Sequence, residues 1–147
     1  MLLQWSKDLA VGHAIVDNDH QMLINIANDV AYAFKSGAGD EAVNRALKRL
    51  AQYVEMQFKR EEALFMTSRY PHKDKHQQNH RNIEKLVRDF QAAYGEDPVQ
   101  ANLVNFLNFF KDWLVRHIDR LDKGYVPYVQ AAEKHTGRPP AARTGFV

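Results

Sequence analysis

Apolar residues recur along the chain at alternating spacings of four and three. This spacing places side chains on one face of a helix, and such a face is buried when helices pack into a bundle. Four stretches show it, with the apolar sets Ile24, Ala27, Ala31, Phe34; Val43, Leu47, Leu50, Val54; Ile83, Val87, Phe90, Tyr94; and Val99, Leu103, Phe106, Phe110, Trp113. The pattern predicts an all-α fold, an antiparallel up-down-up-down four-helix bundle.

Capping residues and helix breakers give the expected boundaries. The four helices are expected to run from 17–19 to Ser36-Gly37, from Asp40 to Tyr70-Pro71, from there to 95–98, and from Val99 to Lys123-Gly124. An irregular N-terminal arm should precede them, and a short fifth segment should span Tyr125 to His135. We expect one domain over residues 1–135 and a disordered tail over 136–147, where little can be buried.

Polar residues interrupt these stripes at corresponding places. They are His20 in the first stretch, Gln57 and Glu61 in the second, His76 and His80 in the third, and His117 in the fourth. In an antiparallel bundle these places form one end, so the side chains should converge on one interior pocket. Burying them without partners would cost several kcal/mol, which leaves a metal ion or a dense hydrogen-bond network. Metal is favoured because four imidazoles offer each other few acceptors.

Composition narrows the choice of metal and partner. The absence of cysteine excludes thiolate ligands, so imidazole and carboxylate groups must hold the metal, as they do iron, manganese or zinc. The net charge of +2 comes from interleaved basic and acidic residues, so no nucleic acid partner is expected. The first residues lack a secretory pattern, and no apolar run approaches the ~18 residues that span a bilayer. We expect a cytoplasmic protein with no membrane contact.

A wider set of residues carries a family resemblance. It consists of Val11-Gly12, Asp17-Asn18-Asp19-His20, Tyr53, Phe58, Glu61-Glu62, Met66, Tyr70-Pro71, His76, His80, and Trp113, His117, Ile118 and Asp122. With this set the chain resembles the bacterial hemerythrins over roughly Trp5 to Tyr128. The resemblance implies a four-helix bundle with two non-haem, carboxylate-bridged iron ions that binds O2 reversibly at one of them.

The resemblance also implies a role for each candidate ligand. His76, His80 and His117 would hold one iron, Glu61 and Asp122 would bridge, and His20 would bind the second iron. Asp122 rests on the resemblance alone. It lies five residues after His117, ~140° around a regular helix, so it joins the pocket only if the helix widens or unwinds near Lys123-Gly124. The alternative is a solvated acid at a helix end.

Gln57 departs from the family pattern. A hemerythrin has histidine at this position, as the second imidazole on the O2-binding iron, so the second iron is the altered one. Three outcomes follow for Gln57: its side-chain oxygen ligates iron, it leaves a position open to water, or a neighbour replaces it. His13 is a conceivable substitute, although a surface or capping role is the simpler interpretation, and Glu55 points the wrong way around the helix.

Other residues have plainer interpretations. His72 should face solvent at a helix start, and His135 should be uninvolved. Glu62 is interpreted as half of a surface ion pair. Trp113 is interpreted as an ordinary core residue that also shields the site from water.

The expected function is binding of O2 or a related small ligand, for storage or delivery. No general base, nucleophile or organic-substrate cleft is visible beyond the metal pocket, so a binding protein is expected rather than an enzyme. One alternative is an O2 or redox sensor, or partner-binding module, read through the C-terminal segment. Another is peroxide or nitric oxide chemistry at an open iron.

Overall fold

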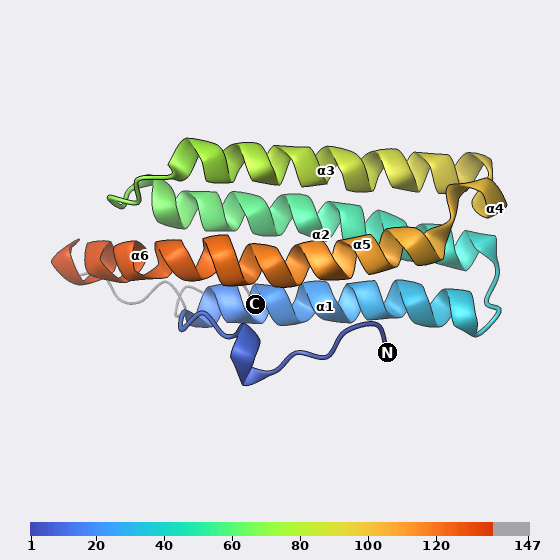
Figure 1. Ribbon diagram of the computed structural model, residues 1–147, viewed down its shortest axis with the longest axis horizontal. Helices are drawn as coiled ribbons and strands as arrows, with labels where there is room; N and C mark the ends of the chain where they lie inside the picture. The colour runs from blue at the N-terminus through green and yellow to red at the C-terminus, as the bar shows by residue number, and fades with distance from the viewer. Residues whose placement is uncertain (137–147) are drawn as a thin grey trace.

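Four long helical rods lie side by side in the computed structural model, which describes residues 1–136 (Figure 1). The first three rods are α1 (Ala14–Lys35), α2 (Asp40–Met66) and α3 (Lys73–Glu96). The fourth is made of α5 (Leu103–His117), the π-helical turn η2 (Ile118–Asp122) and α6 (Lys123–Thr136), with the short helices η1 (Lys7–Leu9) and α4 (Pro98–Ala101) outside the rods. No strand occurs in residues 1–136, so the predicted all-α four-helix bundle is confirmed.

The bundle is held by an apolar core along its length. Successive rods pack on each other, α1 on α2 and α2 on α3. Fully buried side chains from all four rods meet there, among them Leu23, Val30, Leu47, Val54, Val87 and Phe110. Each such side chain stabilises the fold by about 1.5–3 kcal/mol relative to an exposed one. Leu47, Val54, Val87 and Phe110 are stripe positions of the sequence, so hydrophobic spacing accounts for much of the bundle, whereas Leu23 and Val30 widen the buried face of α1 beyond its predicted stripe.

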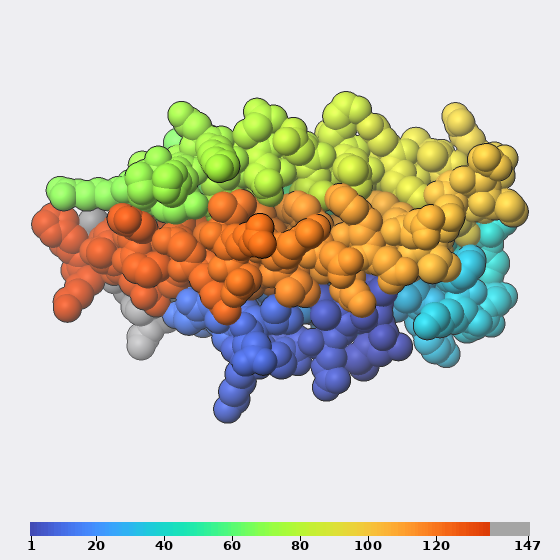
Figure 2. All heavy atoms as spheres, viewed as in Figure 1, coloured from blue at the N-terminus to red at the C-terminus, as the bar shows by residue number. Residues whose placement is uncertain are grey.

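Near its start, the N-terminal arm is tied to the bundle by the side chain of Asn28. The Asn28 carbonyl oxygen accepts hydrogen bonds from the backbone amides of Leu2 and Leu3, at 2.9 and 3.0 Å. Its amide nitrogen donates to the Leu3 carbonyl at 2.8 Å. On the face shown in Figure 2, α5 and α6 run along the middle of the surface between α3 and this arm.

The predicted start of the first helix is wrong. Helix α1 begins at Ala14, so the residues expected to cap it, 17–19, lie inside it. Their carboxylates have other partners: Asp17 accepts a hydrogen bond from the Val11 amide at 2.7 Å, and Asp19 is paired with Arg60 on α2. Asp17 therefore holds the N-terminal arm against α1, and Asp19 holds α2 against it.

The predicted fourth helix differs at both ends. It is interrupted at Asn102, whose backbone is left-handed (φ 58°) and whose side chain caps α5 by accepting from the Asn105 amide. Val99 therefore lies outside the core, 90% exposed, and Phe34 at the end of α1 is also exposed. The helix does not end at Lys123-Gly124 either, because α6 continues to Thr136, the first residue of the predicted tail. The rest of that tail, residues 137–147, lies outside the described residues.

The π-helical turn is the feature that matters most for the site. Within it the Lys123 amide donates to the Ile118 carbonyl, five residues back. A turn of this kind is wider than an α-helical turn, so residues five apart come to one side of the helix. This is the widening that the candidacy of Asp122 required, and it lies just before Lys123.

Helix length and polarity also bear on membrane contact. Within the described part of the chain, no helix is both long enough and apolar enough to span a bilayer.

Candidate metal centre

The candidate ligands meet at one end of the bundle, where spacing placed all of them except Asp122, whose candidacy came from the family resemblance. His20 comes from α1, Gln57 and Glu61 from α2, His76 and His80 from α3, His117 from α5 and Asp122 from η2. All seven side chains are buried. Five of them, Glu61, His76, His80, His117 and Asp122, offer ligand atoms that all lie within 4.8 Å of one another.

The nitrogen and oxygen atoms at the centre approach each other without hydrogen bonding. His76 Nε2 and His117 Nε2 each lie 3.1 Å from Asp122 Oδ1, and His20 Nε2 lies 2.9 Å from Asp122 Oδ2. None of these atoms has a hydrogen-bond partner among the described residues, nor does Nε2 of His80. Each such atom costs about 1–3 kcal/mol if it stays unsatisfied. The set fits a cation, and its imidazole and carboxylate groups suit iron, manganese or zinc.

The opposite edges of three imidazoles are held by neighbours. Nδ1 of His76 lies 3.2 Å from the Tyr70 hydroxyl, Nδ1 of His80 lies 2.7 Å from Glu62 Oε2, and Nδ1 of His117 lies 2.9 Å from Asn79 Oδ1. When Nδ1 carries the hydrogen and donates it to these oxygens, Nε2 keeps its lone pair for a metal. Such partners fix the ring orientation and raise the basicity of the ligand.

Sequence reasoning missed these three supporting residues. Glu62 does form the expected ion pair, with Arg81, but its side chain is only 12% exposed and it also holds His80. The interpretation of Glu62 as a purely surface residue is wrong. Neither Glu62 nor Asn79 lies on a buried stripe, so spacing gives no signal for them. Tyr70 was noted only as part of a family pattern and a helix stop.

The buried carboxyl groups differ in charge. Burial raises the pKa of Glu61 well above its ordinary value, as does the nearby Asp122. Burial would also raise the pKa of Asp122, but His117, with His20 and His76, holds it well below the usual range. Without metal, Glu61 therefore keeps its proton to a higher pH than Asp122 does. A bound cation would displace that proton.

His80 is neutral over the physiological range. Burial lowers its pKa to about 4, although the hydrogen bond to Glu62 acts in the opposite direction. Neutral imidazole is the form that binds a metal.

The α1 and α2 side of the site is built differently. The Gln57 amide nitrogen donates to Glu61 Oε1, and the Gln57 carbonyl oxygen has no partner within residues 1–136. Nδ1 of His20 has no hydrogen-bond partner in that part of the chain either. The Tyr125 hydroxyl donates to the other oxygen of Glu61 at 2.9 Å. Glu61 is thus held from both sides, whereas His20 has no supporting neighbour at Nδ1 in the described chain.

Aromatic rings cover two of the imidazoles. Phe58 stacks on His80 with ring centroids 3.9 Å apart, and Trp113 stacks on His117 at 4.5 Å. Trp113 also packs against the main apolar core, as its spacing predicted. These rings exclude water from one flank of the site.

Two of the remaining sequence candidates, His13 and Glu55, pair with residues outside the cluster. His13 is buried rather than on the surface, and it occupies the N-cap position of α1, one of the two roles expected for it, with Nε2 3.4 Å from Glu133 Oε2 on α6. Glu55 pairs with Arg88 on α3.

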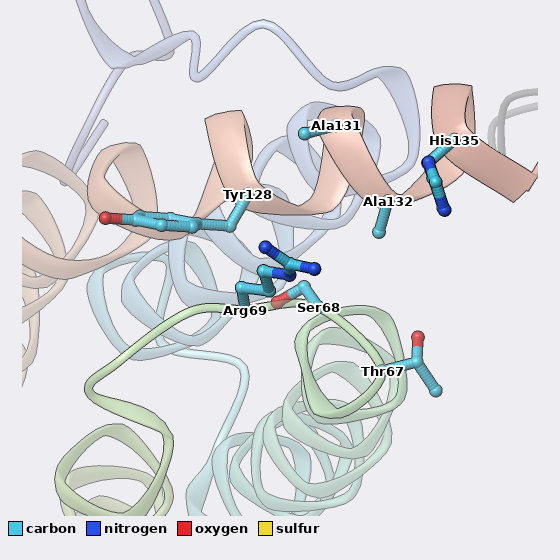
Figure 3. Close-up of a pocket in the computed structure, with 7 residues that line it drawn as sticks. All are labelled: Thr67, Ser68, Arg69, Tyr128, Ala131, Ala132 and His135. Carbon is cyan, nitrogen blue, oxygen red and sulfur yellow. The ribbon is translucent and has the colours of Figure 1, made fainter.

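His72 is exposed, as expected, and His135 is exposed as well. His135 lines a cavity of about 560 Å³ between α6 and the loop after α2, with Arg69 directed towards α6 (Figure 3). No predicted ligand lines this cavity, so it is separate from the metal centre.

A four-helix bundle that gathers imidazoles and carboxylates at one interior end belongs to the class of helical-bundle metal proteins. The Hemerythrin HHE cation binding domain matches residues 11–129, and the chain belongs to the hemerythrin family. The family resemblance seen in the sequence is thereby confirmed.

Individual relatives agree with the family match. A bacteriohemerythrin of Methylococcus capsulatus is 26% identical over 131 residues, which cover 88% of this chain and 98% of the relative. A hemerythrin-like protein of Naegleria gruberi is 31% identical over 121 residues, covering 82% and 88%. A crystal structure of wild-type hemerythrin superposes with a TM-score of 0.77 at 23% identity, covering 88% and 98%. The last comparison supports the fold.

Proposed function

We propose that this chain is a non-haem diiron protein that binds O2 or a related small ligand, with its second iron position altered by Gln57. The observation that carries the proposal is the set of buried Nε2 atoms around Asp122, which lie at contact distance yet make no hydrogen bonds within the described chain. Family membership favours iron among the metals that suit this set of ligands.

The roles follow the sides of the pocket. His76, His80 and His117 would hold the first iron, Glu61 and Asp122 would be shared between the two irons, and His20 would bind the second iron. The iron pair supplies a redox-active position for a small ligand. The chain holds the imidazoles in their metal-binding tautomer through Tyr70, Glu62 and Asn79, and the buried surroundings keep bulk water away.

Of the three outcomes for Gln57, we favour the one in which its side-chain oxygen ligates the second iron. The amide nitrogen is engaged by Glu61, whereas the buried carbonyl oxygen has no partner within residues 1–136 and so fits a cation. The reversed amide would set a carbonyl oxygen against the Glu61 carboxylate, which repels it once the carboxylate is ionised. In this proposal Gln57 would orient Glu61 and would give the second iron a weaker donor than imidazole.

An amide oxygen in place of an imidazole also supports a second candidate function, peroxide or nitric oxide chemistry in place of reversible O2 carriage, because other ligands displace the weaker donor more readily. Storage requires that water and other ligands be kept from the iron, and one imidazole fewer weakens that protection. Reaction of the reduced protein with O2 and with peroxide separates the two. Reversible O2 uptake supports carriage, and continuous consumption of peroxide supports catalysis.

The decisive experiment is iron per chain after anaerobic reconstitution with ferrous iron and removal of the excess. We expect two irons. One iron, lost on His117→Gln but kept on His20→Gln, would contradict the diiron proposal and leave a mononuclear site. No iron would contradict the metal centre itself.

A further inference from the structure

The three supported imidazoles differ in the charge of their supporting groups. His76 faces a phenol and His117 faces an amide carbonyl, both neutral, whereas His80 faces the carboxylate of Glu62. The Glu62 contact is also the shortest of the three, at 2.7 Å. A carboxylate that accepts the Nδ1 hydrogen draws it away from the ring, which makes Nε2 a stronger electron donor than a neutral acceptor would.

Glu62 is in turn connected to the surface. Arg81, the residue after His80, pairs with the same Oε2 atom of Glu62 that accepts from the imidazole. The Arg81 side chain is 41% exposed, whereas that of Glu62 is 12% exposed. The half-buried carboxylate is therefore shared between an inward imidazole and an outward guanidinium. The more the guanidinium neutralises it, the less charge it supplies to His80.

The same helices contain a matched pair that lacks the imidazole. Glu55 and Arg88 pair across α2 and α3 as Glu62 and Arg81 do, each seven residues away along its helix. Glu55 is more exposed, at 34%, and contacts none of the candidate ligands in the described chain. The Glu55–Arg88 pair is an ordinary surface ion pair between two helices. It therefore serves as a control for the loss of a charge from a Glu–Arg pair between these two helices that does not contact an imidazole.

We infer that Glu62 is a positioning residue that sets the electron donation of His80, and that Arg81 moderates it from the protein surface. This inference rests on the proposed function, because it requires a metal on Nε2 of His80. According to this inference, the charge pair Glu62–Arg81 sets how strongly His80 donates electrons to the metal. Neither residue lies on a buried stripe of the sequence. A change in the surroundings of Arg81 would reach the metal through two contacts.

The test compares four variants of the full chain: Glu62→Gln and Arg81→Gln, with Glu55→Gln and Arg88→Gln as matched controls. Glutamine keeps an acceptor oxygen for His80 and removes the charge. We expect Glu62→Gln to weaken metal retention against a chelator roughly 10- to 100-fold, the range for loss of a supporting partner of a metal ligand. It should also raise the reduction potential of the iron centre, because less donation stabilises the oxidised metal less.

Arg81→Gln should shift the potential the opposite way, to lower values, because the Glu62 carboxylate is then less neutralised. A merely structural role would not give opposite signs. In the Co²⁺-loaded protein, the proton NMR signal of the His80 Nδ1 hydrogen should move in both variants and stay in place in both controls.

Equal behaviour of Glu62→Gln and Glu55→Gln, or shifts of the same sign in Glu62→Gln and Arg81→Gln, would overturn the inference while the diiron proposal stands. Failure of the parent chain to retain iron or Co²⁺ would overturn both.

Discussion

On the α3 and α5 side of the metal centre, each of three imidazoles has a neighbour at Nδ1, whereas His20 on α1 has none in residues 1–136. Gln57 on α2 donates from its amide nitrogen to Glu61. One side of the site thus has rings fixed by an oxygen atom at each Nδ1. The other side has one ring without such support and one amide that holds Glu61.

The difference shows which ligands the chain holds in place before a metal binds. Supporting hydrogen bonds hold ligands in place before metal arrives, which raises affinity because less ordering is needed on binding. We therefore expect the three-histidine side to bind metal first and to release it last. The His20 side should exchange ligands more readily, which suits a small molecule that must enter and leave.

The largest effect is expected when a ligand on the three-histidine side is removed. His117→Gln should reduce metal retention by more than the roughly 10- to 100-fold typical of a lost supporting partner, because a ligand is removed. His20→Gln should cost less and leave the first metal bound. Iron per chain after challenge with a chelator measures both.

His72→Gln provides the control, since His72 is exposed one helical turn before His76. If His20→Gln lost as much metal as His117→Gln, the proposed difference between the two sides would be refuted.

A second effect concerns acid. The pKa of His80 is lowered to about 4 by burial, from an ordinary value of 6.5, so the unfolded chain takes up this proton at higher pH than the folded one. The free energy of unfolding of the metal-free protein should fall as the pH decreases from about 6.5 to 4, by up to about 3 kcal/mol from this group. Below pH 4 its contribution should level off.

Urea unfolding at a series of pH values measures this dependence. The difference between the parent and His80→Gln isolates it from the other titrating groups. Parallel stability curves for the two proteins would show that His80 does not carry this acid sensitivity.

The smallest expected effect comes from adding an imidazole to the His20 side, which should bind metal more weakly than the three-histidine side. Gln57→His adds an imidazole where the amide now serves Glu61, and should raise affinity for the second metal roughly tenfold, about 1.4 kcal/mol. Metal titration of the reconstituted protein measures the second binding step. Gln52→His, at an exposed position on the same helix, is the control. An unchanged second step would mean that Gln57 is not what weakens that side.

Hydrophobic spacing predicted the bundle and the end at which the polar residues meet, because both depend on helix periodicity alone. It failed where a stripe runs beyond the packed core: Val99 and Phe34 continue the pattern at helix ends but are exposed. Spacing also could not anticipate Asn102, where a single left-handed residue separates two helices.

The site was predictable in part, for a related reason. His20, Glu61, His76, His80 and His117 interrupt stripes and so could be found from the sequence. The supporting residues Glu62 and Asn79 lie off the stripes, and only packing between helices brings them to the imidazoles. Asp122 needed the family resemblance, since its place depends on one irregular turn that leaves no trace in the hydrophobic pattern.

The π-helical turn at 118–122 changes the direction in which the side chains of α6 point relative to those of α5. In a regular helix each residue rotates the next side chain by ~100°, so the wider turn at 118–122 resets the direction of everything after it. Asp122 and Tyr125 both follow His117 across this turn, and both point at the centre. The number of residues between His117 and Tyr125 is therefore as much a part of the site as their identity. An insertion or deletion of one residue there would rotate the side chains of both Asp122 and Tyr125 away from the centre of the site. Most substitutions there would leave the direction of both side chains unchanged.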